Sequence, residues 1–215
     1  MKTINYSSVT LNDLETIFDI ENINDKTRFH DWFLQEYIFS TDEEHFLEKL
    51  IVKHFQHINS YTELELISKF IAPILNMVDF DMQDKAIRDF YEVQLKFQYH
   101  EEILFNGRCD FVVAKGYDSP INPYFFIQEF KQTSSSFPEY QLLTELIMAT
   151  LINQTNSLKG AYIVGSLWSF VIVEKIKDNY YKYFVSKKYD GMDIDDLKQI
   201  YKNLQIVKRE IYESH

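Results

Sequence analysis

The sequence predicts a mixed α/β (α+β) protein whose sheet is flanked by helices on both faces. Residues 91–99 alternate apolar and polar side chains, which is typical of a half-exposed strand. Phe111 to Ala114 and Tyr124 to Ile127 are short apolar runs separated by a turn-rich segment, which predicts two more strands. A long helix is expected before these three strands and another directly after them. This order of elements favours one sheet between layers of helices.

Residues 1–59 are expected to form a helical N-terminal extension, and residues 60–215 the main domain. Apolar residues at spacings of three and four, such as Phe46, Leu50 and Phe55, predict amphipathic helices. We expect these helices to cover one sheet face or to form a dimer contact. His45, His54 and His57 lack metal-ligand partners at a diagnostic spacing, so we interpret them as surface residues.

The helix expected over residues 60–79 has an N-terminus that can be explained by capping alone. Thr62 is a good N-cap, and Glu63 and Glu65 fall in the first turn, where the helix dipole favours carboxylates. Pro73 should kink or locally loosen this helix.

Charged side chains occur at the ends of the two apolar strands. Asp110 begins the first strand, and Glu129 and Lys131 end the second. Residues two apart in a strand share a face, so Glu129 and Lys131 should point the same way, with Asp110 beside them if the strands pair. A carboxylate entering a buried strand is costly unless it is paired or bound to a cation. The sequence therefore predicts either a functional site or a structural ion pair at this sheet end.

This D-(x)n-E-x-K pattern across a hairpin resembles the core motif of the PD-(D/E)XK nuclease superfamily, the restriction-endonuclease-like fold. Cys109 stands where the name-giving motif has proline. The segment TELELISKFIAPIL, from Thr62 to Leu75, is similar to the E-(x)n-I-x-P-x-L helix in the N-terminal nuclease domains of type I restriction enzymes. The resemblance extends over residues 60 to 212 in element order and implies an αβββαβ core.

The resemblance also implies a chemistry. Asp110, Glu129 and a backbone carbonyl near Phe130 would hold one or two Mg²⁺ or Mn²⁺ ions, and Glu63 would complete the metal shell. Lys131 would orient the attacking water and offset charge on the phosphate.

The helix expected over residues 137–154 starts with Pro138 in its first turn. It carries Gln141 and Glu145 in the Q-x-x-x-E spacing of some branches of the superfamily, on the same stripe as Met148. Gln141 would support Lys131 in the catalytic set, or the pair could lie at the wet edge of the stripe.

The C-terminal part should contain a strand near residues 161–166, a hairpin over 170–186 and a final amphipathic helix. Trp168, Tyr180, Tyr181 and Tyr183 could stack on bases but more often such aromatics pack in a core. The best candidates for contacts to nucleic-acid phosphates are five lysines: Lys159, Lys175, Lys177, Lys187 and Lys188.

The formal net charge is −11, and it is unevenly distributed. Residues 1–106 hold 9 Lys/Arg and 20 Asp/Glu, whereas residues 156–215 hold 10 and 8. Because phosphate contacts need Lys and Arg, any DNA groove should be lined by the C-terminal half. The sequence contains a single cysteine, and neither a signal peptide nor an 18-residue apolar run is visible, so we expect a cytoplasmic protein that does not enter membranes.

The function that these observations favour is metal-dependent hydrolysis of DNA, in restriction, defence or DNA processing. Two alternatives remain open: a nuclease-like fold that serves as a nucleic-acid-binding or assembly subunit, and an enzyme that cleaves RNA. The weak basic character suggests that a second copy or a partner subunit contributes to DNA binding.

Overall fold

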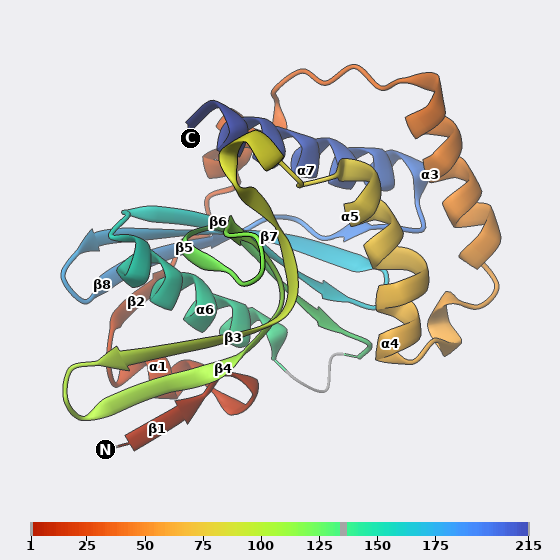
Figure 1. The fold of residues 1–215 in the computed structure, drawn as a ribbon. Helices are drawn as coiled ribbons and strands as arrows, with labels where there is room; N and C mark the ends of the chain where they lie inside the picture. The colour runs from red at the N-terminus through yellow and green to blue at the C-terminus, as the bar shows by residue number, and fades with distance from the viewer. Residues whose placement is uncertain (1, 134–136, 215) are drawn as a thin grey trace.

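The fold, described for residues 2–133 and 137–214 of a computed structural model, is a mixed sheet with helices on both faces (Figure 1). In the described residues the strands form one nine-stranded sheet in the order β1-β4-β5-β6-β7-β8-β2, with β3 added beside β4 and β9 beside β7. The strands are β1 (Lys2–Asn5), β2 (Asp19–Asn22), β3 (Ile87–Tyr99), β4 (Ile103–Lys115), β5 (Ile121–Lys131), β6 (Ser157–Val164), β7 (Leu167–Lys177), β8 (Tyr180–Val185) and β9 (Tyr189–Asp190). The predicted fold class is confirmed at this level.

The helices divide between the two faces. They are α1 (Leu11–Glu15), α2 (His30–Phe33), α3 (Thr41–His54), α4 (Glu63–Leu66), α5 (Ala72–Val78), α6 (Pro138–Asn153) and α7 (Ile194–Ser214). Helices α3, α5 and α7 lie on one side of the sheet, and α6 lies on the other (Figure 1). Each face therefore has its own apolar core.

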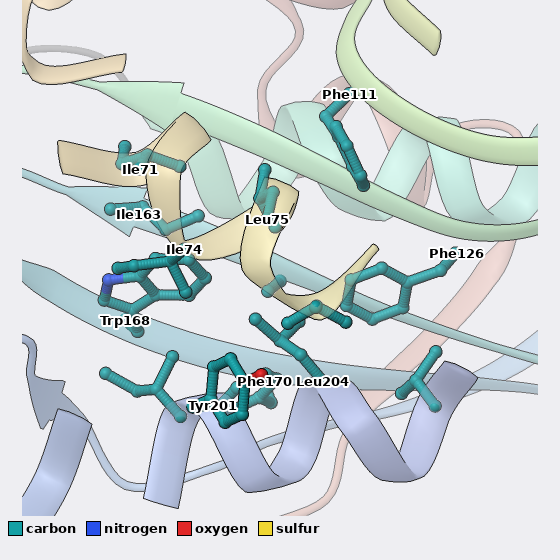
Figure 2. Close-up of a cluster of buried hydrophobic side chains, with 14 of the residues drawn as sticks. Ile71, Ile74, Leu75, Phe111, Phe126, Ile163, Trp168, Phe170, Tyr201 and Leu204 are labelled. Carbon is teal, nitrogen blue, oxygen red and sulfur yellow. The ribbon is translucent and has the colours of Figure 1, made fainter. Parts of the chain in front are cut away.

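The first core lies between the sheet and helices α5 and α7. Figure 2 shows Ile74 and Leu75 of α5 meeting Trp168 of β7 and Leu204 of α7. The second core lies between the sheet and α6. Helix α6 is apolar around most of its circumference, and most of its side chains are buried.

Local signals explain several helix ends. The α4 helix begins with a capping box in which Thr62 and Glu65 bond each other's backbone N–H groups. A π-helical turn at Ile67–Ile71 precedes Pro73, so the predicted loosening is present. Helix α6 has Pro138 in its first turn, as predicted.

The N-terminal residues differ from the expected all-helical extension. β1 pairs in parallel with β4, and β2, predicted as helix, pairs in parallel with β8. Each of these strands has only four residues, too few for a strand period to stand out from a helical one. His54 is also not a surface residue; it is buried and its Nδ1 lies 2.8 Å from the Tyr61 hydroxyl.

The part that positions the candidate site is the run α5, β3, β4, β5, α6 and β6. β3, β4 and β5 are antiparallel neighbours, whereas β5 and β6 are parallel and connected through α6. In such a crossover the helix runs back over the sheet, so the N-terminus of α6 lies near the C-terminal end of β5.

Candidate active site at the end of β5

The site forms where β4 and β5 separate. Their pairing runs from Lys115 opposite Ile121 to Phe111 opposite Gln128 and then stops. At the next position the Asp110 carboxylate accepts a 2.7 Å hydrogen bond from the backbone N–H of Phe130. A side chain thus replaces the ladder acceptor that a neighbouring strand would supply. This bond fixes Asp110 beside the end of β5.

Lys131 joins the two carboxylates. Its Nζ lies 2.5 Å from Oε1 of Glu129 and 3.8 Å from Oδ2 of Asp110. It also donates a 2.9 Å hydrogen bond to the carbonyl of Phe130. The alternation argument therefore predicted the position of Lys131 and Glu129 correctly, and all three charged groups converge.

Glu129 is the least solvated member of this group. Its side chain is 0 % exposed, and neither carboxylate oxygen has a well-aligned hydrogen-bond donor, although Oε1 faces the Lys131 ammonium. Burial and, next, the charge of Asp110 raise the pKa of Glu129 to about 9. Burial is also the main reason why the pKa of Asp110 is raised. Burial alone would lower the pKa of Lys131, but the carboxylates around it raise that pKa on balance.

Helix α6 supplies a second polar pair behind Glu129. Both side chains are buried, and Nε2 of Gln141 donates a 3.2 Å hydrogen bond to Oε1 of Glu145. Burial, followed by the charge of Glu129, raises the pKa of Glu145 well above its usual value. The pair thus lies on the packing stripe and not at its wet edge. The hydrogen bond of Gln141 goes to Glu145, and the support of Lys131 by Gln141 that the resemblance implied stays a prediction.

Glu63 lies at the solvent side of the site. It is the first residue of α4, is exposed, and its Oε2 lies 3.4 Å from the backbone N–H of Gln132. Its charge contributes to the raised pKa values of both Asp110 and Lys131. Glu65, by contrast, is occupied by the capping box and a 2.7 Å ion pair with Lys69.

Glu92 is a neighbour of the site that the sequence did not reveal. It stands between Tyr91 and Val93, which pair with Phe111 and Cys109, so it lies across from Asp110. Its φ of +55° is in the left-handed region, and its carboxylate pairs with Arg108 at 3.0 Å. The alternating pattern of residues 91–99 contains no glycine or proline that could have indicated this irregularity.

Cys109, at the motif's proline position, has a structural environment. Its side chain is fully buried under α6, and burial followed by the charge of Glu145 raises the pKa of the thiol well above its usual value. A thiol that is protonated and buried is a poor nucleophile or ligand. Cys109 therefore fills space beside the polar group.

Four of the five lysines predicted to contact phosphates lie away from this site or are paired, whereas Lys188 is exposed and directly precedes β9, beside the end of β7. Lys175 and Lys177 are at the end of β7 that faces the start of β6, opposite to the end near Lys131. Lys159 pairs with Glu210 of α7, and Lys187 pairs with Asp196 at 3.1 Å. The aromatic candidates Trp168, Tyr181 and Tyr183 are core residues, and Tyr180 remains half-exposed.

Neither a preformed metal site nor a known relative was found for this protein among the described residues and the comparisons made. Across residues 2–133 and 137–214, no group of three or more His, Cys, Asp or Glu side chains is arranged to hold a metal ion. No helix in the same residues is long and apolar enough to cross a membrane. No protein-family model matches the chain, and neither does any curated protein.

Proposed function

We propose that this chain is a metal-dependent nuclease of the PD-(D/E)XK type that hydrolyses phosphodiester bonds in DNA. The observation that carries the proposal is the convergence of Asp110, Glu129 and Lys131 at the end of β5, within 3.8 Å of one ammonium group. Burying the carboxyl group of Glu129 beside an ammonium and a second carboxyl group costs desolvation energy that a structural role does not require. Perturbed ionisable groups of this kind are typical of functional sites.

The order of elements supports the same proposal. A helix, three antiparallel strands, a helix and a strand parallel to the third follow one another from α5 to β6, which matches the αβββαβ order of the superfamily. Asp110 lies in the second of these strands and Glu129 and Lys131 in the third, as in the family's motif.

The residues fit a divalent cation such as Mg²⁺ or Mn²⁺. Glu129 has two buried oxygens, of which Oε1 faces only the Lys131 ammonium, and the Asp110 carboxyl group acts on Glu129 from close by. Mg²⁺ is commonly held by only one or two protein carboxylates, with water and substrate phosphate as the other ligands. Asp110 and Glu129 would be these ligands, with Glu63 on the solvent side. When bound, the cation would lower the pKa of a water molecule and neutralise charge on the phosphate.

The protein's own groups each have a defined part in this proposal. The N–H of Phe130 holds the Asp110 carboxylate in place beside Lys131. Lys131, anchored by the Phe130 carbonyl, would orient the attacking water and offset charge developing on the phosphate oxygens. Gln141 and Glu145 would keep the buried side of Glu129 polar and dry.

Cleavage assays test the proposal directly. Supercoiled plasmid and single-stranded DNA are incubated with the protein and Mg²⁺ or Mn²⁺, beside Asp110→Asn, Lys131→Ala and the control Lys182→Ala. Lys182 also forms an ion pair in a strand, with Glu21 on β2, away from the site. Loss of cleavage in the two site variants alone supports a nuclease. Equal cleavage by all four proteins would point to a contaminant and refute the assignment of the site. RNA substrates in the same assay separate a ribonuclease from a deoxyribonuclease.

A second candidate is a nuclease-like fold that binds nucleic acid or assembles with a partner without cleaving. The close pairing of Lys131 with Glu129 favours it, because an ion pair can stabilise the sheet end without a metal. Under this alternative no DNA is cut, whether or not calorimetry detects stoichiometric Mg²⁺ binding. Complex formation with a second copy or a partner subunit then becomes the functional readout.

A further inference from the structure

An exposed aromatic side chain lies at the N-terminal end of α6, the helix that follows β5 in the chain. Phe137 directly precedes α6 and is 67 % exposed, and its ring stacks on that of Tyr140 with centroids 5.7 Å apart. Phe137 is the N-cap residue of α6, so it stands at the end of the helix, four residues before Gln141 and eight before Glu145. From the interior of the helix toward this end, the positions pass from fully buried Glu145, through buried Gln141, to exposed Phe137.

Because α6 is the crossover between the parallel strands β5 and β6, its N-terminal end, with this aromatic pair, lies toward the end of β5 that carries Lys131. With a rise of 1.5 Å per residue, Phe137 lies about 6 Å beyond Gln141 and about 12 Å beyond Glu145 along the helix. Stacked nucleotides advance about 3.4 Å each along one strand. Phe137 follows Lys131 by six residues, which span at most about 20 Å. A strand whose phosphate reaches Lys131 can therefore have bases near Phe137 only a few nucleotides away.

Apolar residues also lie beside Lys131 at this end of the sheet. Lys131 pairs with Val164, and Val164 pairs with Leu167, so the three lie side by side across β5, β6 and β7. Directly paired residues point to the same face of a sheet, and Leu167 is partly exposed there. Leu64, next to Glu63 on α4, is exposed as well.

The charges near Lys131 disfavour intact duplex DNA. Carboxyl groups of Glu63, Asp110 and Glu129 surround the Lys131 ammonium, and four of the five lysines considered above lie elsewhere or are paired. Duplex binding depends mainly on many cation–phosphate contacts. Aromatic stacking instead binds bases whatever their sequence, and it requires bases that are not enclosed in a duplex.

We propose that Phe137, backed by Tyr140, is a stacking platform for the bases of a single-stranded nucleic acid whose backbone reaches Lys131. This inference rests on the proposed function, since it assigns the substrate class of the same site. It also accounts for an acidic nuclease: affinity comes from stacking, and the local ammonium supplies the phosphate contact.

Binding without cleavage tests the platform. Fluorescein-labelled dT20 and a 20-base-pair duplex are titrated with the protein in EDTA, and anisotropy is measured. The variants are Phe137→Ala, the conservative Phe137→Trp, and the control Tyr117→Ala. Tyr117 is similarly exposed, at 64 %, but lies in the β4–β5 turn at the opposite end of β5.

We expect dT20 to bind more tightly than the duplex. Phe137→Ala should weaken dT20 binding about tenfold, a typical loss for one stacked base. Phe137→Trp should restore the affinity, and Tyr117→Ala should leave it unchanged. The dependence of log affinity on log salt should stay the same in Phe137→Ala, because no phosphate contact is removed.

The possible failures are distinguishable. Tighter duplex binding, no binding of dT20, or equal effects of Phe137→Ala and Tyr117→Ala would overturn the platform. If DNA is cleaved in Mg²⁺ but dT20 binding does not depend on Phe137, the nuclease proposal survives and the platform is refuted. If dT20 binding depends on Phe137 but no nucleic acid is cleaved, the platform is upheld as a binding surface and the nuclease proposal falls.

Discussion

Replacing Glu129 by glutamine should stabilise the protein in the absence of metal, and more so at higher pH. The folded state keeps the Glu129 proton up to a pKa of about 9, whereas the unfolded chain releases it near 4.5. Between these values the unfolded state binds fewer protons, so stability falls as pH rises. Each pH unit costs about 1.4 kcal/mol, hence about 4 kcal/mol between pH 5 and pH 8. Glutamine has a similar shape and no proton to lose, so Glu129→Gln avoids this cost.

Urea unfolding of both proteins in EDTA at pH 5, 6, 7 and 8 measures the effect. The quantity of interest is the free energy of unfolding of Glu129→Gln minus that of the parent, which removes the contributions of all other titrating groups to first order. This difference should increase by up to about 4 kcal/mol from pH 5 to pH 8. A difference that is constant with pH would mean that Glu129 is ionised in the folded protein. The site would then be a plain ion pair with Lys131, and the reasoning about a desolvated ligand would be refuted.

Three further predictions concern the metal, the α4 cap and the core. Mg²⁺ at one hundred times its dissociation constant should raise the free energy of unfolding of the parent by about 2.7 kcal/mol and leave that of Asp110→Asn unchanged, as measured by urea unfolding; equal stabilisation would exclude Asp110 as a ligand. Glu65→Gln should lower the free energy of unfolding by a constant amount from pH 5 to pH 8. Hydrogen bonds from Lys69 and Thr62 lower the pKa of Glu65 to about 2, so the stabilising contribution of its carboxylate is lost only as the pH falls toward that value. A destabilisation that changes between pH 8 and pH 5 would contradict the capping role. Gly160→Ala should cost about 1–3 kcal/mol in thermal or urea unfolding, because its Cβ would meet the Ile127 carbonyl oxygen at 2.7 Å; an unchanged midpoint would show that β5 and β6 can separate.

The sequence predicted those features that depend on local patterns. The apolar stripe and Pro138 predicted α6, and alternation placed Glu129 and Lys131 on one face of β5. The structure agrees with these predictions because each feature is determined by a few neighbouring residues. The meeting of Asp110 with them followed from a hairpin joined by one turn segment, which is also a short-range feature.

Features that depend on distant partners could not be predicted. β1 is a strand because it pairs with residues about one hundred positions further along the chain, and β2 because it pairs with β8. Likewise, nothing in the sequence around Lys159 indicates Glu210 of α7, which pairs with it. Tertiary contacts override weak local propensity in such short segments.

The irregularity around Glu92 explains how the Asp110 carboxylate comes to lie at the end of β5. Phe90 and Val93 are three residues apart yet contribute to the same core, and so do Cys109 and Val112 in the paired strand. In regular strands, residues three apart point to opposite faces. The alternation of side chains between the two faces is therefore interrupted in both strands at the level of Glu92 and Asp110. Asp110 thereby avoids either apolar core and directs its carboxylate along the sheet, where it replaces a strand partner of Phe130. A regular β3–β4 ladder would bury Asp110 in one core or turn it away from Glu129, and the three charged groups could not converge. The left-handed backbone of Glu92, opposite Asp110, therefore helps to position the Asp110 carboxylate, even though the side chain of Glu92 itself pairs with Arg108.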